Sequence, residues 1–255
     1  MSDVLDNRIG RFTSDGQFLG WVVTSGLNSP TSIVIEADSN LLVEDSGNGR
    51  VLRFAPNGTS LGTVALAGSA FQEGMAVDAA GNIYVADGSI IKRFSPAGVD
   101  LGPFATGVGG PGGHGGVLVT ELTFDREGNL FVVEQDAKRI HVFSPSGVDL
   151  GVLATFADFP AGLVFDTAGN LFVNFIQGFP IGLIRKIPVG GGLNSFATTG
   201  YWPHAMAFAE AGNLWCANYG SGTITRFSPA GADLGTLQTL ANGWIRGPLG
   251  LAFRP

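Results

Sequence analysis

The chain has 255 residues, of which 40 are glycine and 13 are proline, yet 45% of its residues are hydrophobic. This combination is typical of a turn-rich globular protein and excludes a disordered one. The formal net charge is −7 and only 14 residues are lysine or arginine. We therefore expect no nucleic-acid partner and no anionic membrane surface as a partner, because both are bound mainly through clustered cations.

The start of the chain, MSDVLDNRIG, lacks the basic residues and the apolar core of a signal peptide. No stretch approaches the roughly 18 apolar residues that a membrane span needs. The sequence leaves the compartment unknown, and a secreted or periplasmic origin would require that a leader was removed. The single cysteine, Cys216, lies in the apolar run NLWCAN, where we expect a buried thiol and no intrachain disulfide.

Three sequence elements recur in the same order along the chain. The first is an apolar opening, seen as TSIVIEAD, EGMAVDAA, TELTFDRE, AGLVFDTA, HAMAFAEA and, at the end, LGLAFRP. The second is Gly-Asn or Ser-Asn before large apolar residues, in SNLLVED, GNIYVAD, GNLFVVE, GNLFVNF and GNLWCAN. The third is a basic-aromatic run before a turn, as in RFAPNGTSLG and RFSPAGVDLG. The asparagines of the second element are 42, 47, 41 and 43 residues apart, a spacing typical of propeller blades.

Each repeat contains four short runs rich in Val, Ile, Leu and Phe, separated by turn residues, and no run is long enough for an ordinary helix. In the first turn, D-x-x-G-N supplies an aspartate that can accept backbone hydrogen bonds and a glycine that can adopt positive φ. In the turn S-P-x-G, proline supplies the φ near about −65° that the turn needs. Each repeat is therefore predicted to form one four-stranded antiparallel sheet.

The predicted fold class is all-β, a six-bladed β-propeller of four-stranded antiparallel blades. Only five repeats are complete, so the sixth blade must combine both chain ends: Leu249–Phe253 as its innermost strand, Val4 and Leu5 as a short second strand, and the following residues as its outer strands. Closing the ring in this way removes an exposed sheet edge. We predict one domain, residues 1–255, with blades at about 31–72, 73–118, 119–159, 160–202, 203–247, and 248–255 plus 1–30.

The runs GMAVDAAGNIYVADGSIIKRFSPAG and VEDSGNGRVLRFAPNG resemble the repeats of the NHL family of β-propellers, and the resemblance covers almost the whole chain. A more distant similarity connects the sequence to gluconolactonase-like and streptogramin-lyase-like propellers. The resemblance implies the fold and not one chemistry, because such propellers serve as peptide, RNA and carbohydrate-binding platforms, as lyases and as hydrolases.

The residue before each innermost strand is expected to point toward the axis of the ring. These six positions hold Thr31, Glu73, Thr120, Ala161, His204 and Leu249. Only Glu73 and His204 can do acid, base or metal chemistry, and they lie three blades apart, so they could meet only across the channel or through a ligand. They are the candidate metal residues.

A second ring of candidate residues comes from the ends of the second strands, where the repeat has Ala-Asp. Asp45, Asp87 and Asn218 are expected to cap their own loops through backbone bonds. Glu44 and Asn174 replace a small residue there and are the better ligand-binding candidates, with Glu134 and Asn218 beside them in the same ring.

Aromatic residues and a long insertion are expected near the same face. Tyr201 and Trp202 precede His204 and could stack on a sugar or another flat ligand, as could Trp244, or could fill the gap between blades. The insertion ATGVGGPGGHGGVLVT carries seven glycines and His114, and it is either a lid over the channel or a solvated loop. His141, in RIHVF, is given no role.

The function predicted first is a binding platform for a small ligand, a glycan or a protein segment at the channel mouth, with the protein a monomer. Resemblance to gluconolactonase-like enzymes implies an alternative, a hydrolase with a divalent cation at Glu73. However, calcium takes six to eight oxygen ligands, and the other five axial positions offer few. Resemblance to streptogramin-type lyases, which use magnesium, implies a second alternative with Glu73 and His204 as base and acid, although those enzymes have seven blades.

No cofactor is firmly implied by the sequence, and calcium, magnesium and zinc remain candidates. The D-x-x-G-N turns lack the oxygen-ligand series of a calcium loop, and no P-loop, zinc spacing or nucleophile elbow is present. A purely structural or assembly role is the remaining hypothesis.

Overall fold

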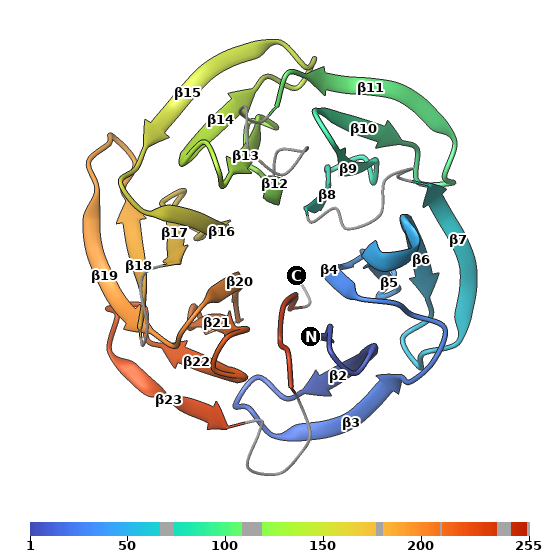
Figure 1. Cartoon of the computed structure of the whole chain (residues 1–255), viewed down its shortest axis with the longest axis horizontal. Helices are drawn as coiled ribbons and strands as arrows, with labels where there is room; N and C mark the ends of the chain where they lie inside the picture. The colour runs from blue at the N-terminus through green and yellow to red at the C-terminus, as the bar shows by residue number, and fades with distance from the viewer. Residues whose placement is uncertain (67–73, 109–118, 177–180, 210, 239–245, 254–255) are drawn as a thin grey trace.

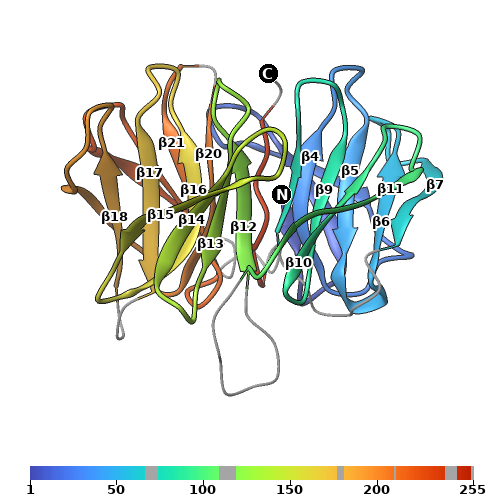
Figure 2. The same ribbon diagram turned by 90° about the horizontal axis from the view of Figure 1, so that it is seen from above.

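Six antiparallel sheets surround a central axis in the computed structural model, so the chain is an all-β, six-bladed β-propeller, as predicted (Figure 1). The structure describes residues 1–66, 74–108, 119–176, 181–209, 211–238 and 246–253. Five sheets have four strands and the sixth has three. Seen from the side, the sheets stand upright around the axis (Figure 2).

The strands of the five complete blades follow the chain from the innermost to the outermost position. Their bounds are β4 Pro30–Ile35, β5 Leu41–Asp45, β6 Arg50–Phe54 and β7 Ser60–Leu66; β8 Met75–Val77, β9 Ile83–Asp87, β10 Ile90–Phe94 and β11 Asp100–Thr106; β12 Val119–Phe124, β13 Leu130–Glu134, β14 Arg139–Phe143 and β15 Asp149–Thr155; β16 Phe159–Phe165, β17 Leu171–Ile176, β18 Gly182–Ile187 and β19 Asn194–Thr199; β20 Pro203–Phe208, β21 Leu214–Asn218, β22 Thr223–Phe227 and β23 Asp233–Gln238. A short 3-10 helix, η1 Ser46–Asn48, follows β5.

The sixth blade joins both ends of the chain, as predicted, through β1 Ser2–Asp3, β2 Arg8–Phe12, β3 Phe18–Val23 and the C-terminal segment. Leu249–Phe253, expected as its innermost strand, forms no regular strand. Asp3 pairs with Pro248, and the Ser2 and Leu249 N–H groups donate to Gly250 and Ser2 carbonyls at 3.0 and 3.2 Å. The expected second strand at Val4 and Leu5 was two residues too late, because those residues form the turn into β2.

The predicted turn chemistry is present in the structure. Asp78 accepts hydrogen bonds from the backbone N–H and the side-chain amide of Asn82, both at 2.8 Å. In the S-P-x-G turn, Gly98 has φ of 83°, and a Cβ added there would collide with the Val64 carbonyl oxygen of the preceding blade. The glycine of this turn is therefore needed both for its backbone conformation and for close packing between blades.

The core consists of separate apolar clusters between neighbouring sheets. Between the fourth and fifth blades, the Phe172 ring packs edge-on against Phe196 and Phe208, with centroids 4.9 and 5.2 Å apart. Cys216 is buried in the same cluster, and burial raises the pKa of its thiol to about 12. Because each blade buries its faces only against its two neighbours, the closed ring completes every core cluster.

Candidate functional site

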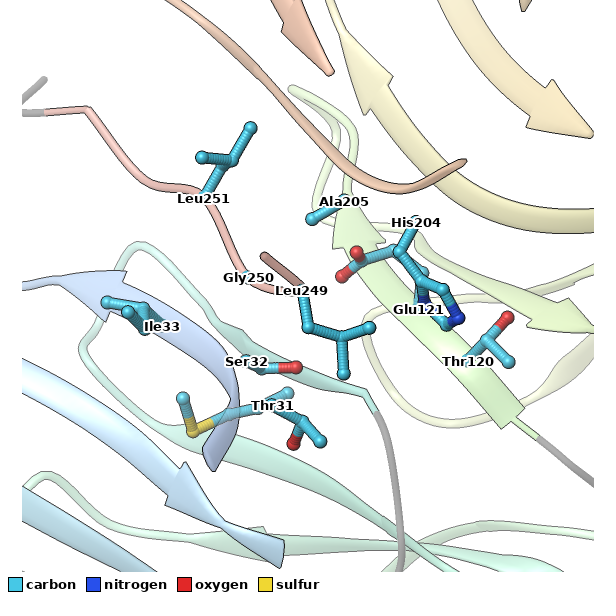
Figure 3. Close-up of a pocket in the computed structure, with 11 residues that line it drawn as sticks. Thr31, Ser32, Ile33, Thr120, Glu121, His204, Ala205, Leu249, Gly250 and Leu251 are labelled. Carbon is cyan, nitrogen blue, oxygen red and sulfur yellow. The ribbon is translucent and has the colours of Figure 1, made fainter. Parts of the chain in front are cut away.

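A small cavity lies on the propeller axis, where the innermost strands begin (Figure 3). Its volume is about 40 Å³, which leaves room for a few water molecules rather than a substrate. Figure 3 shows Thr120, Glu121 and His204 on one side of it and Thr31, Ser32 and Leu249 on the other. A larger ligand would not fit into this cavity.

Glu121 lines the axial cavity although the sequence analysis did not select it. A β-bulge explains the difference: Val119 pairs with Glu134, but Glu121 pairs with Val133, so one extra residue is inserted at Thr120. Comparable register shifts occur in β4, β16 and β20. A bulge leaves two successive residues opposite one partner, and in the third blade both Thr120 and Glu121 line the axial cavity.

His204 is half-buried and lines the axial cavity. Burial lowers the pKa of His204 from 6.5 to about 4, because desolvation penalises the charged imidazolium. The imidazole is therefore neutral at physiological pH. A neutral imidazole can bind a metal ion or accept a proton.

Glu44 and Asn174 connect neighbouring innermost strands. Glu44 is 2% exposed, and its carboxylate accepts hydrogen bonds from the Thr31 hydroxyl at 3.0 Å and the Gly74 N–H at 3.2 Å. Asn174 is fully buried; it accepts the Gly162 N–H at 2.8 Å and donates to the His204 carbonyl. In both cases the partners belong to two adjacent blades, so these side chains hold the ring together at its axis.

Two other axial positions make similar connections. The Thr120 hydroxyl donates to the Ala161 carbonyl of the next blade at 2.7 Å, and both residues are buried. Gly162 is packed so closely that an added Cβ would collide with the His204 carbonyl oxygen. Small residues near the start of innermost strands therefore permit the blades to approach each other.

Glu134 is fully buried and belongs to a chain of polar contacts that crosses the third blade. It pairs with Arg139, and one of its oxygens lies 3.0 Å from Nδ1 of His141, whose Nε2 lies 2.7 Å from the Asp149 carboxylate. Hydrogen bonds lower the pKa of Asp149; the largest contribution comes from the Gly151 N–H and the next from the His141 side chain. His141, which the sequence analysis left without a role, thus joins the second strand to the outermost strand.

Asn218 is fully buried and bonds to three threonine hydroxyls, two in its own blade and one, that of Thr199, in the fourth blade. Its Oδ1 accepts from Thr199 at 2.8 Å, and its Nδ2 donates to Thr223 and Thr225 at 3.2 and 3.0 Å. Asp45, at the equivalent position of the first blade, accepts the Asn28 N–H at 2.5 Å and pairs with Arg50 at 2.7 Å. These groups close the loops at the ends of the second strands.

An aromatic cluster lies at the start of the fifth blade and includes Tyr219, which the sequence analysis did not select. The Trp202 ring is 5.8 Å from Tyr219 and 6.0 Å from Tyr201, and Trp202 is 40% exposed. The Tyr219 N–H donates to the Trp202 carbonyl at 2.9 Å, which ties the inter-blade loop to the strand 2–3 loop. Ser29 immediately precedes the innermost strand of the first blade, as Trp202 precedes that of the fifth, and both residues have positive φ. The two blades therefore share this backbone conformation and differ in the side chain, which is an indole in the fifth blade.

A second exposed aromatic side chain lies on the same face. Phe159 is the first residue of β16, close to the position that Trp202 has immediately before β20. The Phe159 side chain is 42% exposed. The Lys138 ammonium lies 4.3 Å from the centre of the Phe159 ring. The fourth and fifth blades therefore each present an aromatic ring where their innermost strands begin.

Metal binding depends partly on residues outside the described ranges. Glu73, His114 and Trp244 all lie outside them. Within the described ranges, no three histidine, cysteine, aspartate or glutamate residues gather closely enough to hold a metal ion. In the axial cavity the described residues supply one carboxylate and one imidazole, Glu121 and His204, which falls short of the six to eight oxygens that calcium takes.

No family model matches the chain, and no curated protein matches its sequence. Among solved structures, the nidogen/laminin complex gives a TM-score of 0.79 at 15% identity, over 96% of this chain and 94% of the other. The NHL-type propeller resemblance is confirmed at the level of fold. A gluconolactonase from Xanthomonas campestris gives 0.69 at 21% identity, over 88% and 79% of the two chains. A catalytically inactive virginiamycin B lyase from Staphylococcus aureus, with quinupristin, gives 0.63 at 17% identity, over 89% and 76%.

At such identities the similarity shows a shared fold and not a shared activity. In the described part of the chain, no helix has the length and apolar character needed to cross a membrane.

Proposed function

We propose that this protein is a binding platform whose ligand docks on the face formed by the inter-blade loops and the strand 2–3 loops. The observation that carries the proposal is the exposed indole of Trp202, supported edge-on by Tyr219 and flanked by Tyr201. Exposed, well-supported aromatic rings offer a large contact area and lose little conformational freedom when a ligand binds. The narrow axial cavity favours binding at the surface over binding inside the channel.

The ligand class that fits this surface best is a glycan. A sugar ring has an apolar face that can stack on an indole or a phenol, and its hydroxyl groups can bond to the polar loop ends nearby. Phe159 of the adjacent blade offers a second ring on the same face, which suits a ligand of several sugar units. The nidogen/laminin complex contains a similar propeller within a protein assembly, so a protein segment is the other class of ligand to test.

The experiment is a binding screen with cello-, chito- and xylo-oligosaccharides, followed by saturation-transfer NMR. Truncating an aromatic anchor at the centre of an interface costs about 2 kcal/mol or more. We therefore expect Trp202→Ala to raise the Kd roughly 30-fold without lowering the melting temperature. Leu61→Ala, an exposed apolar residue on β7, is the matched control and should leave the Kd unchanged. An unchanged Kd for Trp202→Ala would contradict the proposal.

A metal-assisted hydrolase or lyase that uses Glu73 and His204 is a second candidate function. The low pKa of His204 keeps its imidazole neutral and able to bind a metal ion. It counts against the role of acid that the lyase alternative gives to His204, because an acid must carry the proton it donates. Calcium, magnesium and zinc are each added to the protein while its melting temperature is measured. A rise that Glu73→Ala abolishes would favour the enzyme, because a ligand that binds only the folded state stabilises it. No rise with any ion would count against the enzyme.

A further inference from the structure

The fifth blade lacks a carboxylate that the other complete blades carry in the turn between their first two strands. Four positions before the turn asparagine, the five complete blades have Glu36, Asp78, Asp125, Asp166 and, in the fifth blade, Ala209. In every one of these turns the N–H of this residue donates to the carbonyl of the asparagine, at 2.9–3.0 Å. The backbone of the turn is therefore shared, and the fifth blade differs in having no acidic side chain at this position.

The turn asparagine of the fifth blade, Asn213, is affected first. In the second, third and fourth blades the turn aspartate accepts the backbone N–H of the asparagine at 2.8 Å and its side-chain amide at 2.7–2.8 Å. In the first blade Asp38 accepts the side-chain amide of Asn40 at 2.7 Å. Among the described residues, no carboxylate accepts a hydrogen bond from the Asn213 amide, which lines a cavity instead.

The cation that belongs with this carboxylate is still present in the fifth blade. The ladders between the second and third strands place Arg226 at the same position as Arg53, Arg93 and Lys186. Arg53 makes two hydrogen bonds to the Glu36 carboxylate, both at 2.7 Å. The Lys186 ammonium lies 3.8 Å from the Asp166 carboxylate. The fifth blade therefore keeps the cation of this pair and has lost the anion.

The described part of the chain supplies no carboxylate to Arg226. Its guanidinium donates to two neutral groups, the carbonyls of Asp15 in the sixth blade and Leu234. Its Nε, the atom that in Arg53 donates to Glu36, is buried and has no acceptor among the described residues. The Asp15 carboxylate is exposed and accepts the Thr13 hydroxyl instead. Since an unmatched donor on a charged group is costly, the site favours an added anion.

A cavity of about 460 Å³ lies beside these groups, within the range of roughly 300–1,000 Å³ that is typical of ligand pockets. We call it the fifth-blade cavity; it is lined by Ser14, Asp15, Ala209, Ala211, Asn213, Trp215, Arg226 and Leu234. Ser14, Asp15 and Ala211 lie in turns and are exposed, so the cavity opens to solvent there. Because adjacent strands are antiparallel, these turns lie on the face opposite the strand 2–3 loops and Trp202.

We propose that the fifth-blade cavity binds a small monocarboxylic acid, whose carboxylate takes the place of the missing turn side chain between Arg226 and Asn213. A guanidinium and an amide are donors that suit a carboxylate. Ala209, Ala211 and Leu234 provide apolar walls for a compact hydrocarbon body. The Asp15 carboxylate at the rim disfavours a second negative charge on the ligand.

The probe is phenylacetate, added to the full chain and followed by isothermal titration calorimetry. We expect saturable binding and a rise in melting temperature, because a ligand that binds only the folded state stabilises it. Phenylacetamide has nearly the same shape without the charge, and it should bind roughly tenfold more weakly or worse, since the charge-assisted hydrogen bonds are lost. An equal rise in melting temperature with sodium chloride at the same ionic strength would reduce the effect to unspecific anion binding and overturn the proposal.

The variant Ala209→Asp tests the location. It restores the side chain that three other blades carry in this turn, so the fold should tolerate it. We expect a higher melting temperature than in the parent chain and a roughly tenfold or greater loss of phenylacetate affinity. Ala168→Asp is the matched control, because it adds the same charge at an exposed position of the corresponding turn in the fourth blade. It should leave the affinity unchanged.

The proposal is wrong if phenylacetate does not bind, if phenylacetamide binds as tightly, or if Ala209→Asp binds phenylacetate as the parent chain does. Glu210 lies outside the described residues, and Glu210→Gln should bind phenylacetate as the parent chain does. Binding to this variant alone would show that the chain fills the site with its own carboxylate, which would also overturn the proposal. Trp202→Ala should leave phenylacetate binding unchanged, which makes this test independent of the proposed function.

Discussion

Asn174→Ala should destabilise the propeller strongly. The substitution removes the hydrogen bonds of a fully buried side chain, and it leaves the Gly162 N–H and the His204 carbonyl without this partner. Each buried backbone group that loses its partner costs about 1–3 kcal/mol, so the expected loss is about 2–6 kcal/mol in the free energy of unfolding. For a domain of this size that is a fall in melting temperature on the order of 5–20 °C.

The assay is urea and thermal unfolding of the variant and the parent chain, followed by circular dichroism at one pH. Asn57→Ala is the matched control, because Asn57 also accepts one backbone N–H, that of Thr59 at 3.0 Å, but lies exposed in a turn. Its effect should stay within about 0.5 kcal/mol. A loss below about 1 kcal/mol for Asn174→Ala would refute the structural role and favour Asn174 as a ligand-binding residue.

Three further predictions follow from the burial of particular groups. The pKa of His204 is about 4 in the folded state, against 6.5 ordinarily, so the unfolded chain takes up a proton at a higher pH than the folded chain does. The free energy of unfolding should therefore fall by up to about 3 kcal/mol between pH 6.5 and 4. Urea titrations measure this fall, and an equal fall in the variant His204→Gln would contradict the prediction. Gly98→Ala should lower the free energy of unfolding by about 1–3 kcal/mol more than Gly102→Ala does. Both glycines have positive φ, but only Gly98 faces a carbonyl oxygen, that of Val64. Equal urea midpoints for the two variants would count against this prediction. Cys216, whose pKa burial raises to about 12, should react with iodoacetamide at pH 8 only after unfolding, as mass spectrometry can show.

The architecture could be predicted from the sequence because its signals are local. The D-x-x-G-N turn needs only an aspartate and an amide a few residues apart, as Asp78 and Asn82 show, and alternating apolar runs define strands without reference to distant residues. The phased recurrence of these elements gave the number of blades. The closure by both chain ends followed from counting the repeats.

The roles of the axial residues could not be predicted in the same way. Glu121 reaches the channel because of a bulge in β12, and nothing in the run TELTFDRE distinguishes a bulged strand from a regular one. Glu44 and Asn174 look like exposed ligand groups in the repeat pattern, yet the next blade buries them and supplies their partners. Such contacts join residues about 30 positions apart.

The sequence by itself thus determined the six blades, their turns and the closure by both chain ends. Only the tertiary structure decided which side chains reach the axis and which ones join neighbouring blades. The physical reason is that a repeat specifies its own hydrogen bonds locally, whereas the burial of its faces depends on the adjacent sheets that pack against it.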